Sequence, residues 1–261
     1  MTSILLYFST FILGLIIGSF LNCVIYRLEK EESLWGRSYC PNCKHNLAWY
    51  DLVPIFSFIF LGGKCRYCKF KISFNYPLIE LITAIVFLLI SMFYLIQPVL
   101  SLHYLASVIF YFYIASTLIV IFAFDLKHYI IPDKVLFPAI LLTIIYQLAV
   151  NYQFLIFNLL LSAIGASLFF FIIFLISGGR WIGFGDVKFA IFLGLILGFP
   201  NILVGLFLAF FFGAIIGSIL MLFKFKGLKS ELPFAPFLIC GTFLAMFFGE
   251  NLIEWYLKFL I

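Results

Sequence analysis

Residues 202–223 read ILVGLFLAFFFGAIIGSILMLF, a run that contains no charged side chain. About 20 such residues form a helix long enough to cross the roughly 30 Å hydrocarbon core of a bilayer. Backbone groups inside lipid must find hydrogen-bond partners within their own segment, which long runs achieve as helices, whereas barrel strands alternate over about ten residues. Because 66% of the 261 residues are hydrophobic and only 10% are charged, we expect an all-α polytopic membrane protein.

Apolar runs of this kind recur along the whole chain and predict about eight transmembrane helices. The expected spans are residues 4–26, 76–96, 104–124, 135–150, 154–176, 187–197, 202–223 and 234–248. No basic region precedes the first run, so we interpret it as a transmembrane helix and not as a cleavable signal. The sixth run is shorter than the others.

The segment between the first two spans has a different composition. Residues 27–75 carry half of the sixteen Lys and Arg residues and four of the six cysteines. This composition indicates a small soluble insert. We therefore divide the chain into a first transmembrane helix (1–26), the insert (27–75) and a membrane domain (76–261).

The other basic residues fall mostly in every second connection between the expected spans. By the positive-inside rule, the insert and these connections lie in the cytoplasm, and both termini face outward. Of the sixteen basic residues, only Lys258 then lies outside. Orientation in the membrane explains the formal charge of +5 better than an acidic partner does, so we expect no nucleic acid as a partner.

The insert contains two CxxC pairs, CPNC at residues 40–43 and CRYC at residues 65–68. Two thiolates three residues apart can hold one edge of a tetrahedral ion, and a second such pair completes the site. The spacing predicts a zinc-ribbon-like insert whose Zn²⁺ is structural, because four protein ligands leave no open position for catalysis. Two disulfides are the alternative, which a reducing cytoplasm disfavours. The expected metal ligands are Cys40, Cys43, Cys65 and Cys68.

Two carboxylates stand at the ends of expected spans. Asp125 ends the third span, and Asp186 begins the sixth in the sequence GFGDVK, residues 183–188. Two spans lie between them, one crossing outward and one crossing back, so both carboxylates return to the cytoplasmic face. Ionisable residues in membrane segments are costly and are functional-site hypotheses by default. A pair of this kind shares a proton and can act as general base and general acid on a peptide bond, as in an aspartic protease.

Each element of this pair also has a structural interpretation. Asp125 could cap a helix or bind a nearby lysine, and Asp186 could be an N-cap. Asp133 is the rival first carboxylate, although its place just before the next span favours capping. We expect Gly183 and Gly185 to let a substrate strand approach the backbone and to adopt torsions closed to other residues.

Two functions of other classes are open at this point. A proton- or cation-coupled transporter would use the aspartates as a relay. It predicts ionisable residues near the middle of the membrane and broken helices in symmetric halves, and the sequence shows neither. A zinc-dependent membrane scaffold would dock partners on the insert and use the aspartates only as helix caps.

Several motifs, taken in order, resemble those of the type IV prepilin peptidases, which are membrane aspartic proteases with a GxGD motif. The resemblance runs through nearly the whole chain, and a lone GxGD would be far less specific. It rests on Gly18–Asn22 with Tyr26–Leu28, the two CxxC pairs, Gly62–Cys65, Tyr76–Glu80, Asp125 with Ile131–Asp133, Gly183–Lys188 and Pro233–Phe237.

The resemblance implies a multi-pass enzyme of the bacterial cytoplasmic (inner) membrane, with its active site facing the cytoplasm. Such an enzyme cleaves the basic leader from type IV prepilins or pseudopilins after a glycine. The family's catalytic aspartates fall on Asp125 and Asp186, and Asp133 matches a non-catalytic position. The residues expected to shape the site are Gly183, Gly185, Asp133 and Lys188.

The resemblance further implies methylation of the new amino terminus with S-adenosyl-L-methionine as methyl donor. The family's insert is associated with this activity, and an implicated glycine falls on Gly63. Glu80, about one turn into the second span, is either a structural partner for a basic side chain or a contributor to methylation. No GxGxxG motif follows a strand, so a peptidase without methyltransferase activity is the alternative.

Overall fold

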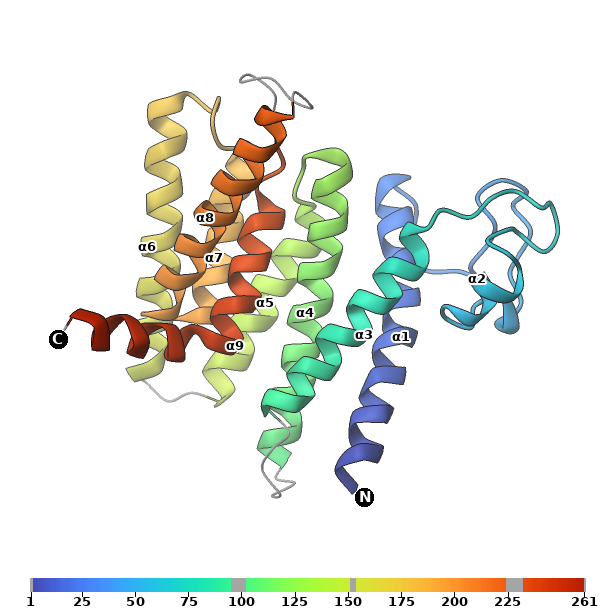
Figure 1. Ribbon diagram of the computed structural model, residues 1–261, viewed down its shortest axis with the longest axis horizontal. Coiled ribbons are helices and arrows are strands. Elements are labelled where there is room, and N and C mark those ends of the chain that lie inside the picture. The colour runs from blue at the N-terminus through green and yellow to red at the C-terminus, as the bar shows by residue number, and fades with distance from the viewer. Residues whose placement is uncertain (1, 95–101, 151–153, 224–231, 261) are drawn as a thin grey trace. The chain divides into compact units, whose positions relative to one another are not determined.

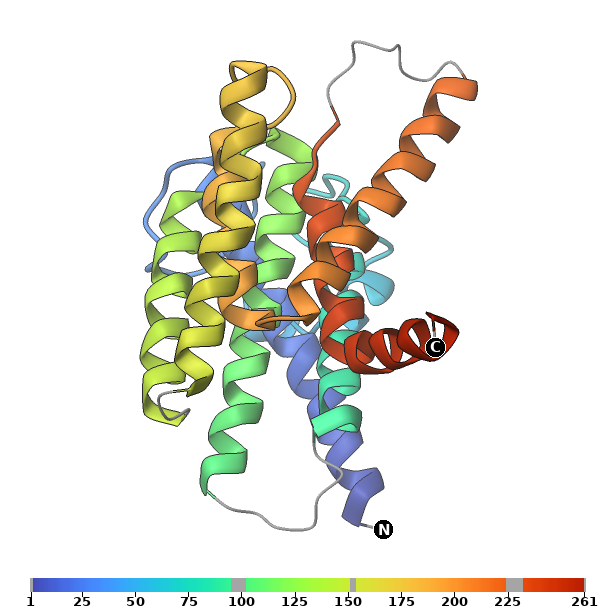
Figure 2. The ribbon, with the colours of Figure 1, turned by 90° about the vertical axis from the view of Figure 1, so that its left-hand side faces the viewer.

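A computed structural model describes residues 2–94, 102–150, 154–223 and 232–260. Figure 1 shows that helices dominate this part of the chain, and Figure 2 gives a second view. The helices are α1 (Thr2–Glu29), α2 (Phe56–Phe60), α3 (Asn75–Tyr94), α4 (Leu102–His128), α5 (Asp133–Val150), α6 (Phe154–Ser177), α7 (Phe184–Leu197), α8 (Asn201–Leu222) and α9 (Ala235–Leu260), with a 3₁₀ turn at Trp49–Asp51.

The predicted all-α membrane class is confirmed. Six of the described helices, α1, α3, α4, α6, α8 and α9, are long and apolar enough to cross a membrane. The helices α5 and α7 are not among these six, so the count of eight spans stays a prediction. The last helix extends past the apolar run that predicted it, to Leu260 and not Phe248, because helix propagation depends on backbone hydrogen bonds and not on hydropathy.

The chain divides into two compact units, residues 1–120 and 121–261. In the first unit, α1 and α3 pack against each other through glycines. A Cβ atom at Gly14 would lie 2.5 Å from the Cα atom of Ala84, and one at Gly18 would lie 2.7 Å from the Cα atom of Glu80. The two backbones therefore approach closely along an antiparallel pair, as small residues permit in membrane helices.

The insert is attached to the end of α1 by a buried arginine. The guanidinium of Arg27 donates hydrogen bonds of 2.5–3.2 Å to four backbone carbonyls, those of Ser33, Leu34, Gly36 and Arg37. Asn22, also on α1, donates a 2.9 Å hydrogen bond to the carbonyl of Tyr76 at the start of α3. These contacts fix where the chain leaves the first helix and where it enters the next.

In the second unit, α7 is the most enclosed helix, and it contacts α5, α6, α8 and α9 (Figures 1 and 2). Its buried residues include Phe189, Phe192 and Leu193. A Cβ atom at Gly194 would collide with the backbone of Ala163 on α6. Because protein surrounds α7, its 14 residues need not match the thickness of a bilayer.

The close approach of α6 and α7 predicts a large difference between two glycine substitutions. Gly194→Val should destabilise the protein by about 1–3 kcal/mol or prevent folding, because the new side chain meets backbone atoms that cannot rotate away. Gly165→Val on α6 is the matched control, because a Cβ atom there meets nothing within 4 Å. Thermal unfolding in detergent measures both, and equal midpoints would contradict the packing described.

Candidate active site and metal centre

Asp186 lies in the first turn of α7, three residues after Gly183, which is the N-cap of the helix. The backbone N–H of Gly183 donates a 3.3 Å hydrogen bond to the Asp186 Oδ2 atom. The positive end of the helix dipole also stabilises a carboxylate in this position. The N-cap alternative for Asp186 is therefore wrong, because Gly183 is the cap, and Asp186 instead accepts a hydrogen bond from the capping residue.

Asp125 lies near the end of α4, one turn before the helix ends at His128. The residue is only 5% exposed. The backbone N–H of Ala235, the first residue of α9, donates toward its carboxylate. Its Oδ2 atom is buried and has no hydrogen-bond partner among the described residues. A buried carboxylate without a full set of partners is costly, which favours a role other than stability.

The structure brings Asp125 and Asp186 together within the second unit, where their charges repel each other. The parity of the intervening helices predicted only that both carboxylates lie at the same face, which permits this proximity. When two carboxylates interact in this way, ionisation of one disfavours ionisation of the other, so a pair of this kind can share one proton. One member can then accept a proton from water while the other donates one, which is the requirement for general acid–base cleavage of an amide.

Asp133 is engaged elsewhere in the same unit. It is the first residue of α5, and its carboxylate forms an ion pair with the ammonium group of Lys188 on α7. The Lys188 Nζ atom also lies 5.5 Å from the ring centroid of Phe137 and 5.9 Å from that of Phe184. Two of the residues expected to shape the site, Asp133 and Lys188, therefore join α5 to α7.

The expected torsions of Gly183 and Gly185 are wrong. Gly183 has φ −75° and ψ 153°, and neither glycine is among the residues with positive φ. What the two positions provide is space, because a Cβ atom at either would have no neighbour closer than 3.6 Å. The nearest atoms to Gly185 belong to Ile131. Glycine at these two positions leaves space beside Asp186, although neither backbone conformation requires glycine.

The four cysteines of the insert form one cluster. Their Sγ atoms all lie within 4.8 Å of one another, and those of Cys40 and Cys68 are 3.9 Å apart. Zn–S bonds of about 2.3 Å in a tetrahedron place the sulfurs about 3.8 Å apart, so the cluster fits a metal such as zinc. His45 lies outside the cluster, with its ring 3.7 Å from that of Tyr67.

The two CxxC turns have the same backbone geometry. In the first, the N–H of Lys44 binds the carbonyl of Cys40, and Lys44 has φ 59°. In the second, the N–H of Lys69 binds the carbonyl of Cys65, and Lys69 has φ 58°. Each pair is therefore presented by a tight turn, and the residue directly after its second cysteine takes a left-handed conformation.

The thiols of the cluster differ in acidity. Hydrogen bonds from the backbone N–H of Phe70 and the side chain of Asn42 lower the pKa of Cys68 to about 6. The backbone N–H of His45 lowers the pKa of Cys43, but desolvation and the neighbouring thiols outweigh it and raise the value to about 11. A bound cation would stabilise the thiolate forms, so metal binding at this cluster would release protons from the thiols.

Glu80 and Gly63 both contact the segment that contains α2. The buried Glu80 accepts a 2.7 Å hydrogen bond from the backbone N–H of Ile55, so its partner there is a peptide group and not a basic side chain, which was one of the two alternatives. Gly63 has φ 66°, and a Cβ atom there would lie 3.1 Å from the ring of Phe58. Here the backbone conformation favours glycine.

Sequence reasoning missed two groups that hold the sites in place. One is Arg27, which was counted as a basic residue and as part of the Tyr26–Leu28 motif but was given no structural role. The other is the N–H of Ala235, a backbone group with no sequence signal beyond the nearby prolines at 233 and 236. An arginine directly after an apolar span is the one signal that could have indicated the first.

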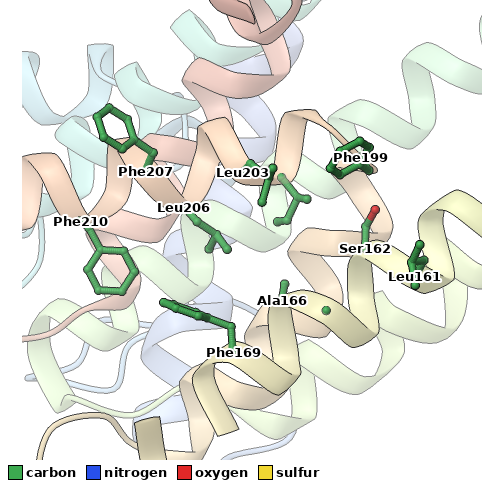
Figure 3. Close-up of a pocket in the computed structure, with 11 residues that line it drawn as sticks. Leu161, Ser162, Ala166, Phe169, Phe199, Leu203, Leu206, Phe207 and Phe210 are labelled. Atoms are coloured by element: carbon green, nitrogen blue, oxygen red, sulfur yellow. The ribbon is translucent and has the colours of Figure 1, made fainter. Parts of the chain in front are cut away.

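The second unit also contains an apolar pocket of about 510 Å³ between α6 and α8, shown in Figure 3. Leu161 and Phe169 on α6 and Leu203 and Phe210 on α8 line it. No ionisable residue lines this pocket, so it is separate from the acidic pair and offers no group for acid–base chemistry.

Comparisons with known proteins agree with this arrangement. Residues 12–94 match the bacterial peptidase A24 N-terminal domain, and residues 112–218 match the type IV leader peptidase family. A relative from Bacillus subtilis (strain 168), named prepilin leader peptidase/N-methyltransferase, is 33% identical over 95% of this chain and 96% of its own. A relative of the same name from Aeromonas salmonicida is 29% identical over 97% and 94%.

A third relative of that name, from Klebsiella pneumoniae, is 34% identical over 72% of this chain and 83% of its own. No solved structure matches the chain. The two domain matches together cover α1 from residue 12 onward, all of α3 and both carboxylates of the acidic pair. The chain belongs to the type IV leader peptidase family.

Proposed function

We propose that this protein is a membrane-embedded aspartic endopeptidase that removes the basic leader from type IV prepilins or pseudopilins, after a glycine and at the cytoplasmic face. The observation that carries the proposal is the buried Asp125 carboxylate, incompletely hydrogen-bonded and close to Asp186. The relatives' shared name supports this substrate class. The basic residues of the insert and of alternate connections support the cytoplasmic side.

In the proposed mechanism the two carboxylates act as one unit on a bound water. One carboxylate accepts a proton from the water, whose oxygen attacks the carbonyl carbon of the scissile peptide. The other carboxylate donates its proton to the nitrogen as the C–N bond breaks. The products are a leader that ends in a carboxylate and a pilin with a free amine. Because the pair titrates together, the two roles belong to the pair.

The surroundings of the pair set its geometry. The N–H groups of Gly183 and Ala235 hold one oxygen of each carboxylate, which leaves the remaining oxygens for water and substrate. The ion pair of Asp133 with Lys188 fixes the start of α5 against α7. The substrate's apolar helix enters laterally from the bilayer in this scheme, with its basic leader in the cytoplasm.

We also propose that the new amino terminus is methylated and that the insert carries this activity. The relatives are named N-methyltransferases, and the family's methyl donor is S-adenosyl-L-methionine. The pocket of Figure 3 does not fit this charged donor, because no ionisable side chain lines it. We therefore propose no binding residues for S-adenosyl-L-methionine. Gly63 and Glu80 instead shape the insert in this proposal.

A structural Zn²⁺ held by the four cysteines is the third part of the proposal. Four thiolates fill the tetrahedral coordination of zinc, so the ion would organise the insert and would not activate water. The insert has about fifty residues and buries little apolar surface, and domains of this size commonly depend on a metal for folding.

Neutralising either catalytic aspartate should abolish cleavage. Asp125→Asn and Asp186→Asn should each slow leader removal by about 10²–10⁴-fold, because loss of either carboxylate removes the acid–base pair. Asp133→Asn is the control on a neighbouring carboxylate and should retain most activity. Mass spectrometry of a purified prepilin incubated with each variant in detergent measures the result. Normal cleavage by either of the first two variants would refute the assignment.

Removing a cluster cysteine should remove the metal. Cys65→Ser should lose the single zinc ion per chain, since three thiolates hold zinc far more weakly than four. Cys240→Ser is the matched control, because Cys240 lies on α9 outside the cluster. Elemental analysis of protein purified without chelator measures the zinc. Two disulfides detected among the four cysteines would show that the alternative is correct.

Substitutions at two adjacent glycines should distinguish methylation from cleavage. Gly62 and Gly63 both have positive φ, but only a Cβ atom at Gly63 meets the ring of Phe58. Gly63→Ala should therefore lose methylation while cleavage persists, and Gly62→Ala, which carries the same backbone strain, should lose much less. Incubation with prepilin and labelled S-adenosylmethionine reads both activities together. Equal methylation by the two variants would argue against a role for the Gly63 contact.

A further inference from the structure

The insert exposes an apolar surface that its fold does not use. Residues 52–63 contain no charged side chain, and five large apolar residues of this stretch are exposed. Phe60 is 84% exposed, Ile59 64% and Phe56 57%. We call this surface the apolar ridge, and its residues are Leu52, Val53, Phe56, Ile59 and Phe60.

The ridge is held in a fixed orientation by the residues between its members. The ring of Phe58 packs edge-on against that of Phe74, with centroids 6.2 Å apart, and the N–H of Ile55 binds Glu80 on α3. The short helix α2 is thus attached through Phe58 and Ile55 on one side. Phe56, Ile59 and Phe60 are left on the other side.

The hydrogen bond that attaches Ile55 to Glu80 lies within the length of the membrane helices and not beyond their ends. Glu80 is the sixth residue of α3, about 7–8 Å from its start at 1.5 Å per residue. It packs against Gly18, which lies about 16 Å before the end of α1 by the same rise. Both residues belong to helices long and apolar enough to cross a membrane. Figure 1 accordingly shows α2 at a level within the length of α1 and not beyond its end.

Basic residues follow the ridge directly. Lys64, Lys69 and Lys71 are exposed, whereas Arg66 is bound to Asp51 through a 2.7 Å ion pair. An apolar surface bordered by lysines is the pattern of a segment that lies in the membrane interface. The aromatic side chains enter the acyl region and the ammonium groups reach anionic headgroups.

Charge argues against the leader of a prepilin as the occupant of this surface. Residues 27–75 contain eight basic residues and four acidic ones, Glu29, Glu31, Glu32 and Asp51, which leaves a net charge of +4. A basic leader would be repelled by this segment, whereas an anionic lipid surface would be attracted.

We propose that the apolar ridge is seated in the bilayer interface, with acyl chains around Phe56, Ile59 and Phe60 and anionic phospholipid headgroups at Lys64, Lys69 and Lys71. The insert is then a membrane-bound element and not a domain free in solution. The proposal rests on the chain being a membrane protein and does not depend on the peptidase mechanism.

Photo-cross-linking in vesicles tests whether the apolar ridge lies in the bilayer interface. Benzoylphenylalanine replaces Phe60 in the full-length protein, reconstituted in phosphatidylethanolamine and phosphatidylglycerol with a prepilin present. Phe8 on α1, an exposed residue of a candidate span, is the lipid-facing control. Asn46, which is exposed three residues after Cys43, is the aqueous control. Mass spectrometry should show phospholipid adducts at position 60 with a yield near that at position 8 and at least about five-fold above that at position 46.

Three outcomes would overturn the proposal. They are a lipid yield at position 60 as low as that at position 46, an adduct mainly with the prepilin, or an adduct mainly with a second copy of the chain. Substituting Ile59 in the same way gives an independent reading. Replacing phosphatidylglycerol with phosphatidylcholine should lower the yield at position 60 about two-fold or more and leave position 8 unchanged. Equal loss at both positions would refute the role of anionic headgroups.

Discussion

A carboxylate at the end of a membrane helix, buried and incompletely hydrogen-bonded, is the constraint on which this structure depends. Asp125 is enclosed at the end of α4, where the start of α9 approaches it and the start of α7 brings Asp186 near. Burial of an incompletely hydrogen-bonded carboxylate costs free energy, which the packing around it has to offset. The three helix ends that meet at Asp125 therefore define the site more firmly than the GxGD motif alone does.

The helices that carry the site are fixed by close backbone contacts. Gly194 lets α7 press against α6, and Gly205 and Gly241 bring α8 and α9 together. In lipid there is no hydrophobic drive to associate apolar helices, so packing of small residues supplies much of the attraction. These contacts hold the first turn of α7, and with it Asp186, in a defined place within its unit.

The sequence was sufficient for several of these features and not for others. Long apolar runs predicted the helical membrane class, because hydropathy and length alone decide whether a segment can span. The two CxxC pairs predicted the cysteine cluster, since the spacing itself sets the geometry. The torsions of Gly183 were wrong, and the hydrogen bonds of Arg27 and Ala235 were missed, because they depend on which segments meet in space. The ion pair of Asp133 with Lys188 was missed for the same reason.

The measurement that tests the central claim most directly is a double-mutant cycle on leader removal. Single-turnover rates would be compared for Asp125→Asn, Asp186→Asn and the variant that carries both changes. If the two carboxylates act as one unit, the double variant should be no slower than the slower single variant, because either change alone already destroys the pair. Multiplicative effects would contradict the account, because they would show two carboxylates that act independently.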